Sequence, residues 1–294
     1  MRRFAAVAMV AALGAGLAAC GSSGSKSAST DKTTTTLANS ECGAVPAGAA
    51  GFKPVANDTL TVVTSLPGPG FWEGSDTDPT KLTSGYEYDI AKCMERDFGL
   101  HKLVVRNVSF DAIVAGTVTN YDLALSQISI TAARAKVVSF SQSYFQSNQG
   151  ILMRAGSTVS TLAQAKALKW GVQTATTAVD LLTKIGATNV HTYSSLDDVY
   201  TALQANQINA VLIDTAINLG EAARSKGAFK VVAQFNQPGG PDQYGAILPK
   251  GSANLGAVNA VFSSMLSGGQ IKALADKDLT GDPGTIPIIT VPNP

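Results

Sequence analysis

Arg134 is the residue whose position in this sequence is hardest to explain by local structure alone. It stands three residues after Thr131 in the stretch LALSQISITAARAKVVSF, residues 123–140. This pattern predicts a buried strand that leads into a helix capped by Thr131. A cation in the first turn of such a helix opposes the backbone dipole by roughly 0.3–1 kcal/mol. An anion bound between the guanidinium and the free N–H groups would remove the conflict. An exposed arginine that bends toward solvent is the plain alternative.

The chemistry around Arg134 favours a carboxylate as that anion. The guanidinium fork matches a carboxylate bidentately, and Ser129 and Thr131 add hydroxyl and backbone donors nearby. A second helix start with accessible amides follows the strand expected to end at Gln173, where residues 174–177 are small or carry hydroxyls. Many strand–helix turns look like this second one, so it is a weak motif by itself.

Asp214 supplies a charge of the opposite sign. It ends the apolar run INAVLID, residues 208–214, where its carboxylate would be desolvated unless it is paired. Ligands of open α/β sheets bind beyond the carboxyl ends of the strands, which is where Asp214 would lie. The simple alternative is that Asp214 caps the following helix. A carboxylate clamp at Arg134 together with a buried anion at Asp214 would recognise a zwitterion, such as an α-amino acid.

Short strands and helices alternate from residue 59 to the C-terminus. This alternation predicts an α/β fold with a mainly parallel sheet, and about 240 residues divide better into two lobes than into one core. Strands are expected at 59–64, 102–108, 121–126, 150–156, 168–173, 189–194, 208–214, 229–235 and 244–250. Helices are expected at 85–99, 110–117, 176–186, 195–207, 215–227 and 254–277.

The first residues form an export signal. Two arginines precede an apolar run that is too short to span a bilayer, which predicts a cleaved signal peptide over residues 1–19. Leu17-Ala18-Ala19-Cys20 resembles the lipobox of bacterial lipoproteins, which implies lipidation of Cys20; a plain signal peptide with an incidental cysteine is the alternative. Residues 20–58 are expected to be a tether and lead-in, since 13 of the 20 residues in 21–40 are Gly, Ser or Thr.

Composition argues against several other classes of protein. The formal net charge of +1 gives no electrostatic case for binding nucleic acid. His101 and His191 are far apart and lack the spacing of metal ligands, and no P-loop, G-x-S-x-G or cofactor motif is present.

Cys42 and Cys93 are an even pair in an exported chain, and either a disulfide or two buried thiols would account for them.

Five stretches in one order resemble a known family. They are GYEYDIA, YDLALSQISITAARAKVVSFSQSYF, GVQTATTA, NAVLID, and YGAILPKGS with the helix after it. Over residues 59–283 the chain resembles the family 3 solute-binding proteins that feed ABC importers of polar amino acids. The resemblance implies a two-lobe periplasmic-binding-protein-like fold of type II that closes by hinge bending around a ligand in the cleft. Lobe 1 would comprise 59–145 plus 242–294, and lobe 2 would comprise 146–241.

The same resemblance implies roles for the site residues. Arg134 would clamp the ligand carboxylate, helped by Ser129 and by the amide of Thr177. Asp214 would bind the ammonium, with the backbone carbonyl of Gln127 as a second acceptor. The side chain of the ligand would lie between Phe110 and an aromatic of the GFWEG loop. The remaining residues assigned to the ligand site are Thr131, Gln173, Phe71 and Trp72.

Two positions depart from the family pattern. Ala132-Ala133 stands where Pro-Glu is usual, and Gln127 stands where glycine is common, which puts a side chain next to the pocket. An acidic ligand would need an extra cation, which these motifs lack. Ser65, Gln127 and Gln173 offer neutral hydrogen-bonding groups instead, which favours a neutral polar amino acid such as glutamine over glutamate.

The sequence thus predicts a monomeric receptor, lipid-anchored at the extracytoplasmic face of the cell membrane, that passes an amino acid to an ABC permease. It would use no cofactor and would not be an enzyme. One alternative is an enzyme on the same scaffold, similar to cyclohexadienyl dehydratases, with Glu73 as the nearest candidate acid. Another is a ligand-sensing receptor subunit, which would share every pocket residue and differ only in its partner.

Overall fold

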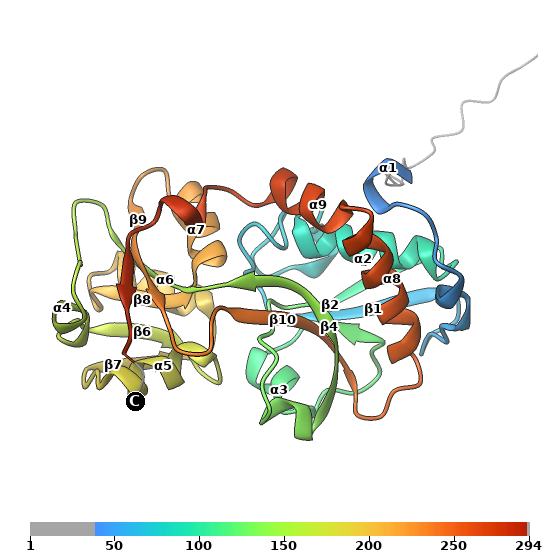
Figure 1. The fold of residues 1–294 in the computed structure, drawn as a ribbon, viewed down its shortest axis with the longest axis horizontal. Coiled ribbons are helices and arrows are strands. Elements are labelled where there is room, and N and C mark those ends of the chain that lie inside the picture. The colour runs from blue at the N-terminus through green and yellow to red at the C-terminus, as the bar shows by residue number, and fades with distance from the viewer. Residues whose placement is uncertain (1–38, 293–294) are drawn as a thin grey trace, which may run out of the picture. The chain divides into compact units, whose positions relative to one another are not determined.

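Two β-sheets flanked by helices organise residues 39–292, the part of the chain that this computed structural model describes (Figure 1). The sheet of lobe 1 has the strand order β2-β1-β3-β10-β4, and the sheet of lobe 2 has the order β11-β9-β5-β8-β6-β7. Lobe 1 contains β1 (Thr59–Thr64), β2 (Lys102–Asn107), β3 (Leu123–Ala124), β4 (Val138–Ser147) and β10 (Asp242–Pro249). Lobe 2 contains β5 (Gln149–Arg154), β6 (Trp170–Gln173), β7 (Val190–Tyr193), β8 (Ala210–Asp214), β9 (Phe229–Asn236) and β11 (Ile288–Thr290).

Helices connect and cover these strands. Those of lobe 1 are α1 (Asn39–Cys42), α2 (Tyr86–Asp97), α3 (Phe110–Val114), α8 (Leu255–Ser267) and α9 (Gln270–Asp278). Those of lobe 2 are α4 (Leu162–Lys166), α5 (Thr177–Ile185), α6 (Leu196–Gln204) and α7 (Thr215–Arg224). Short 3₁₀ turns are η1 (Ala47–Gly51), η2 (Pro79–Lys81), η3 (Arg134–Lys136) and η4 (Pro283–Thr285). Within residues 39–292, none of the helices combines the length and the apolar character that crossing a membrane requires. The expected signal peptide, Cys20 and most of the tether lie outside the described residues.

Both sheets are mixed, whereas a mainly parallel sheet was expected. The βαβ units give parallel pairs, such as β1 with β2 and with β3, and β6 with β7 and with β8. The strands that carry the chain between lobes add antiparallel pairs, β10 with β3 and β4 in one sheet and β5 with β8 and β9 in the other. These strands reach their sheet directly from the other lobe, without the helical crossover that a parallel connection needs.

The chain passes between lobes three times. It leaves lobe 1 at Asn148, between β4 and β5, and returns through residues 237–241, between β9 and β10. After α9 it crosses again, and β11 pairs in parallel with β9. The assignment of residues 242–294 to lobe 1 is therefore wrong for the C-terminal segment. The reason is hydrophobic: Ile289 and Val291 are 4% and 5% exposed and pack in the core of lobe 2.

The long helix expected over residues 254–277 is two helices. α8 ends at Ser267, and α9 starts at Gln270 after a turn at Gly268 and Gly269. Gly269 has φ +80°, a left-handed conformation that only glycine adopts without strain, so the chain changes direction there.

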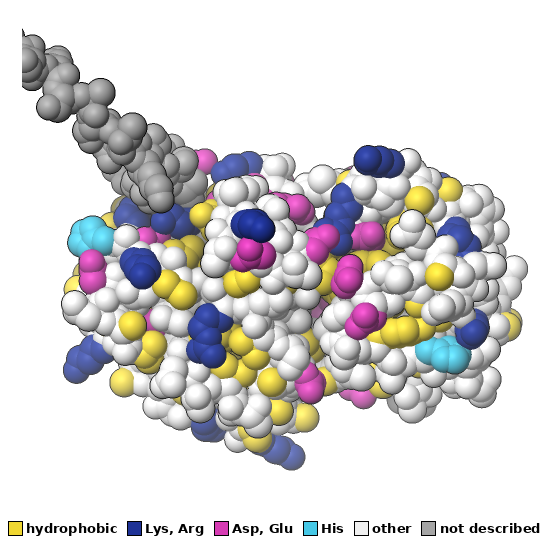
Figure 2. Space-filling view, turned by 180° about the vertical axis from the view of Figure 1, so that it is seen from behind, with side chains coloured by type: hydrophobic (Ala, Val, Ile, Leu, Met, Phe, Trp, Pro, Cys, Tyr) yellow, Lys and Arg dark blue, Asp and Glu magenta, His cyan; other side chains and the backbone are white. Residues whose placement is uncertain are grey.

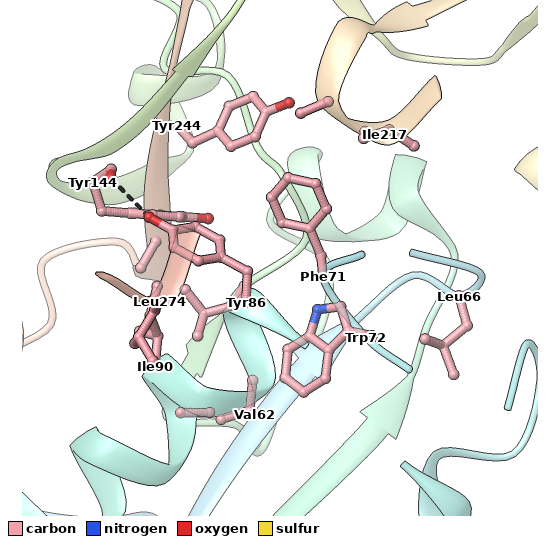
Figure 3. Packing of buried hydrophobic residues seen from close by; sticks show 14 of the residues in the cluster. Val62, Leu66, Phe71, Trp72, Tyr86, Ile90, Tyr144, Ile217, Tyr244 and Leu274 are labelled. Atoms are coloured by element: carbon pink, nitrogen blue, oxygen red, sulfur yellow. Dashed lines mark hydrogen bonds between the residues drawn. The ribbon is translucent and has the colours of Figure 1, made fainter. Parts of the chain in front are cut away.

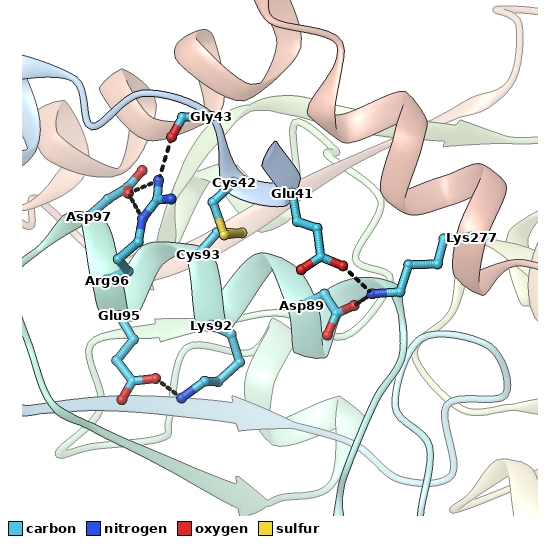
Figure 4. Close-up of a disulfide and its surroundings, with 10 residues drawn as sticks. All are labelled: Glu41, Cys42, Gly43, Asp89, Lys92, Cys93, Glu95, Arg96, Asp97 and Lys277. Atoms are coloured by element: carbon cyan, nitrogen blue, oxygen red, sulfur yellow. Dashed lines mark hydrogen bonds and ion pairs between the residues drawn. A yellow bond between two sulfur atoms is a disulfide. The ribbon is translucent and has the colours of Figure 1, made fainter. Parts of the chain in front are cut away.

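The start of the described chain is fastened to lobe 1 (Figure 4). Cys42 and Cys93 form a disulfide that joins α1 to α2, and both residues are at most 1% exposed. Around it, Lys277 Nζ pairs with Glu41 at 3.2 Å and with Asp89 at 2.6 Å. The structure therefore contains the disulfide rather than two buried thiols. This disulfide attaches the lead-in to α2 covalently, whereas Lys277 attaches it through an ion pair with Glu41.

Removing this disulfide should destabilise the protein without weakening its ligand site. The bond closes a loop with a sequence separation of 51 residues, for which loop-closure entropy predicts a loss of about 2–5 kcal/mol in the free energy of unfolding. Urea unfolding of the Cys42→Ala/Cys93→Ala double variant would measure the loss. A reducing agent should destabilise the wild type and leave the variant unchanged; an equal response of both proteins would contradict the bond.

Candidate functional site

A cavity between the two lobes collects residues from the ends of several strands. Its lining combines polar and apolar side chains from both lobes, as the lining of a small-molecule site does. Lobe 1 contributes Ser65, Phe110, Ser126, Gln127, Ser129 and Arg134. Lobe 2 contributes Gln173, Thr176, Thr177, Leu196, Ile213, Asp214 and Ile217. Among the described residues, the charged side chains of this lining are one cation, Arg134, and one acid, Asp214.

Arg134 stands in a single turn, not in the first turn of a longer helix. The 3₁₀ turn η3 spans only Arg134–Lys136. The Thr131 hydroxyl accepts a hydrogen bond from the Arg134 backbone N–H at 3.2 Å, but the N-cap residue of η3 is Ala133 and not Thr131. Thr131 is not among the residues that line the cavity. The short turn also means that the opposing dipole is much weaker than the sequence indicated.

The Arg134 guanidinium is held by groups from both lobes. Nη1 donates to the Ser129 carbonyl at 2.7 Å, and Nη2 donates to the Ala175 carbonyl at 2.8 Å. The guanidinium carbon lies 5.4 Å from the centre of the Phe110 ring, a cation–π contact. Arg134 is 8% exposed; burial lowers its pKa, and the Asp214 carboxylate opposes this. An arginine stays charged in such a place, so the cavity holds an oriented cation.

Asp214 is the acidic residue of the same cavity, and its hydrogen-bonding neighbours, the Tyr244 hydroxyl and the Gln149 side chain, are neutral. It ends β8, is 3% exposed, and its Oδ1 has no hydrogen-bond partner among the described residues. Asp214 is the N-cap residue of α7, as the helix-cap alternative expected, but its side chain makes no capping hydrogen bond. Burial raises the pKa of Asp214 well above its usual value, and the neighbouring carboxylate of Asp242 raises it further. A buried carboxylate left in this way is a site for a cationic group.

Other predicted residues surround this pair. Thr177 opens α5, and its hydroxyl donates to Asp242 Oδ2 at 3.0 Å. Gln173 ends β6, and its side-chain amide donates to the Ser194 carbonyl at 3.2 Å. Gln127 is 6% exposed and adopts φ +50°, in the region that favours glycine. The structure therefore brings Ser129, Gln127, Gln173, Thr177 and Phe110 to one cavity with the charged pair.

Phe71 and Trp72 do not reach the cavity, which corrects the expected aromatic sandwich. Phe71 is fully buried and makes an edge contact with Tyr86, 5.7 Å between ring centres (Figure 3). A second edge contact joins it to Phe145 at 5.9 Å. The Trp72 indole N–H donates to Glu87 Oε2 at 2.8 Å. The loop folds back onto α2, since Tyr86 N–H donates to the Gly70 carbonyl at 3.0 Å. Both rings thereby belong to the core of lobe 1.

Glu73, the candidate acid for an enzyme, is also absent from the cavity lining. Its Oε1 accepts a hydrogen bond from the Gly70 backbone N–H at 2.6 Å, so it stabilises the loop. Four lining residues escaped sequence reasoning: Ser126, Leu196, Ile213 and Ile217. Each lies within three residues of a strand's carboxyl end, the one signal that could have identified them.

The two histidines take part in local contacts only. His101 Nδ1 lies 2.8 Å from Asp58 Oδ1, and His191 Nε2 lies 3.1 Å from Asn189 Oδ1. Figure 2 shows histidine side chains well apart on the surface. In residues 39–292, no group of His, Cys, Asp and Glu has an arrangement that could hold a metal ion.

The arrangement of strands, crossings and cavity agrees with comparisons against known proteins. The model of the bacterial extracellular solute-binding proteins, family 3, matches residues 68–280. The chain belongs to this family. Among curated family relatives, the ABC transporter glutamine-binding protein GlnH of Bacillus subtilis is 27% identical over 210 residues, 68% of this chain and 74% of GlnH. The L-cystine-binding protein TcyJ of Escherichia coli K12 is 26% identical over 206 residues, 68% of this chain and 75% of TcyJ.

Solved structures of amino-acid-binding proteins confirm the fold. An ancestral arginine-binding protein bound to glutamine superposes with a TM-score of 0.66 at 25% identity, covering 76% of this chain and 98% of that protein. The family 3 fold is the two-lobe periplasmic-binding-protein fold of type II, as the sequence motifs indicated. Its relatives are substrate-binding proteins of amino-acid ABC transporters, not enzymes.

Proposed function

We propose that this protein is the substrate-binding lipoprotein of an ABC importer and captures a neutral polar amino acid, such as glutamine. One observation carries the proposal: a single small cavity is lined by one cation, Arg134, and one anion, Asp214, and by no other charged side chain. The relatives include binding proteins for glutamine, for L-cystine and for arginine, which supports an amino-acid ligand.

The two charges match the two ends of a free amino acid. Arg134 would bind the α-carboxylate through its guanidinium, whose fork suits two parallel hydrogen bonds. Asp214 would bind the α-ammonium, which would supply the partner that its Oδ1 lacks. The Thr177 amide and the Ser129 side chain would add donors to the carboxylate, and the Gln127 carbonyl would accept from the ammonium.

A neutral side chain fits the remaining lining. Ser65, Gln127 and Gln173 offer hydrogen bonds, while Phe110 and Leu196 offer apolar walls. A cationic side chain would need a second acid in the lining; the neighbouring Asp242 is not part of the lining and accepts hydrogen bonds from Thr177 and Gln149. An acidic side chain would need a second cation, which the lining among the described residues does not contain. The charge left unpaired would make either ligand costly to bury.

The described conformation is a closed one, in which lobe contacts surround the cavity. Arg224 Nη1, at the end of α7, pairs with Asp76 Oδ1 of lobe 1 at 2.5 Å. On the same helix, a methyl group added at Gly220 would lie 2.7 Å from the Pro69 backbone, so the lobes touch closely there. Opening would separate these contacts by bending at the three crossings, which are Asn148, residues 237–241 and residues 279–287.

Isothermal titration with each of the twenty common amino acids tests the proposal. We expect one or a few neutral polar amino acids to bind and the acidic ones to fail. Folded protein that binds none of them would overturn the proposed function. Turnover of a prephenate-like compound would instead establish the dehydratase alternative.

For the lipid anchor, mass spectrometry of the exported protein should find an N-terminal Cys20 with a diacylglyceryl group; an unmodified thiol would refute the anchor.

Binding should weaken as the pH falls. The ammonium needs an ionised Asp214, whose pKa is raised in the free protein, so binding releases a proton once the pH is below that pKa. Affinity should then fall by up to about tenfold per pH unit. Titrations in buffers of different ionisation enthalpy would count the released protons. Asp276→Asn, an exposed carboxylate on α9, should keep the slope of the wild type. A flat profile would contradict the role of Asp214.

A further inference from the structure

Glu87 is a buried carboxylate that no cation neutralises. It is the second residue of α2 and is 0% exposed. It accepts hydrogen bonds from Trp72 Nε1 at 2.8 Å, from Gln127 N at 2.8 Å and Nε2 at 2.5 Å, and from the Tyr144 hydroxyl at 2.5 Å. All four donors are neutral, and none of the ion pairs within residues 39–292 includes Glu87. Burial raises the pKa of Glu87, and the bond from Tyr144 is the strongest influence in the other direction.

Gln127 is the one partner of Glu87 that also lines the cavity. Its φ of +50° is strained for any residue other than glycine. Both its backbone N–H and its side-chain amide donate to the same carboxylate. These two bonds offset the strain and leave Gln127 little freedom, in its backbone or in its side chain. The shape of the cavity wall at Gln127 therefore depends on Glu87.

The other two donors to Glu87 are Tyr144 and Trp72. Tyr144 lies on a strand that leads into a crossing between the lobes, and Trp72 lies next to a loop that contacts lobe 2. Tyr144 lies on β4, four residues before the crossing at Asn148, and its carbonyl accepts from the Tyr86 hydroxyl at 3.1 Å (Figure 3). Trp72 follows the loop in which Pro69 touches Gly220 of lobe 2. One carboxylate thus joins a cavity wall, a crossing strand and a loop that contacts the opposite lobe.

We propose that Glu87 is a positioning residue that holds Gln127 in its left-handed conformation and so sets the affinity and selectivity of the cavity. It acts through Gln127 and does not touch the ligand. Its effect on ligand affinity rests on the proposed function; its effect on Gln127 does not. Glu87→Gln is the informative change, because it keeps the size of the side chain but points an N–H₂ group at neighbours that are themselves donors.

Amide hydrogen exchange in the absence of ligand tests whether Glu87 holds Gln127 in its left-handed conformation. Exchange at the Gln127 amide should be at least about tenfold faster in Glu87→Gln, because a hydrogen bond to a buried carboxylate contributes about 1.5–3 kcal/mol. Tyr144→Phe, a milder change, should accelerate it less. The Val62 amide in β1 serves as the control for global stability. Wild-type exchange at Gln127 in Glu87→Gln would overturn the proposal.

Titration with L-glutamine in a double-mutant cycle tests whether Glu87 affects ligand affinity through Gln127. Glu87→Gln should bind at least about tenfold more weakly than the wild type, and the loss should shrink in a Gln127→Gly background, because glycine adopts φ +50° unaided. An equal loss in both backgrounds, or wild-type affinity in Glu87→Gln, would overturn action through Gln127. If the wild type binds none of the twenty amino acids while Gln127 exchange is still accelerated, the proposed transport function fails and the positioning of Gln127 stands.

Discussion

Replacing Arg134 with alanine should abolish amino-acid binding and leave the fold intact. The change removes the only cation that lines the cavity, and with it the paired hydrogen bonds to the α-carboxylate. Hydrogen bonds to charged groups contribute about 1.5–3 kcal/mol each, so affinity should fall at least roughly 100-fold. Isothermal titration measures the loss, and circular dichroism checks the fold.

Two further variants separate charge from geometry at this position. Arg134→Lys keeps the charge but not the fork, and it should also bind poorly. Lys136→Ala removes an exposed cation from the same turn, outside the cavity, and should bind like the wild type. Unchanged affinity in Arg134→Ala would show that the clamp is assigned to the wrong residue.

Replacing Asp214 with asparagine should abolish binding and make the ligand-free protein more stable. The α-ammonium loses its charged partner, so affinity should again fall at least roughly 100-fold. The pKa of Asp214 is raised in the folded state, so the stability that its protonated form provides is lost as the pH rises through that pKa. Asparagine has no such dependence. Near neutral pH the melting temperature should therefore rise by at least roughly 2–4 °C, the shift that 1 kcal/mol produces in a domain of this size.

The sign of this stability change distinguishes a ligand group from a structural one. The gain should shrink toward acid pH, where Asp214 is protonated in both states. Asp276→Asn, an exposed carboxylate in an ion pair on α9, should change the melting temperature little at any pH. A destabilised Asp214→Asn would mean that the carboxylate holds the fold together, and the ammonium site would have to lie elsewhere.

Sequence reasoning worked best where a short pattern carries its own physics. The alternation of apolar strands and amphipathic helices determined the α/β class. β1, α2 and β2 lie within a few residues of their predicted bounds. Arg134 and Asp214 drew attention because each charge was expected in a place that needs an opposite partner. The structure puts both in one cavity. These are local properties, and periodicity and electrostatics report them without knowledge of distant residues.

Tertiary contacts decided the features that depend on residues far apart in the sequence. From the sequence, Phe71 and Trp72 are aromatic residues of a loop that could face a ligand. The loop folds back onto α2, and this buries both side chains. The last strand joins lobe 2 because β9 offers an open edge to Ile288–Thr290, which no pattern near that strand announces. Glu87 reads as an ordinary acidic residue in the first turn of a helix. Its burial against donors 15, 40 and 57 residues away exists only in the folded chain.

The sequence by itself thus determined the kinds of elements, the charged pair and the family, because each is written in residue types at fixed spacings. Only the tertiary structure decided which side chains face the cavity, where the C-terminus pairs and how Gln127 tolerates its conformation. Those outcomes depend on contacts between segments far apart in the chain, and their energies are set by burial and hydrogen bonding that local sequence does not encode.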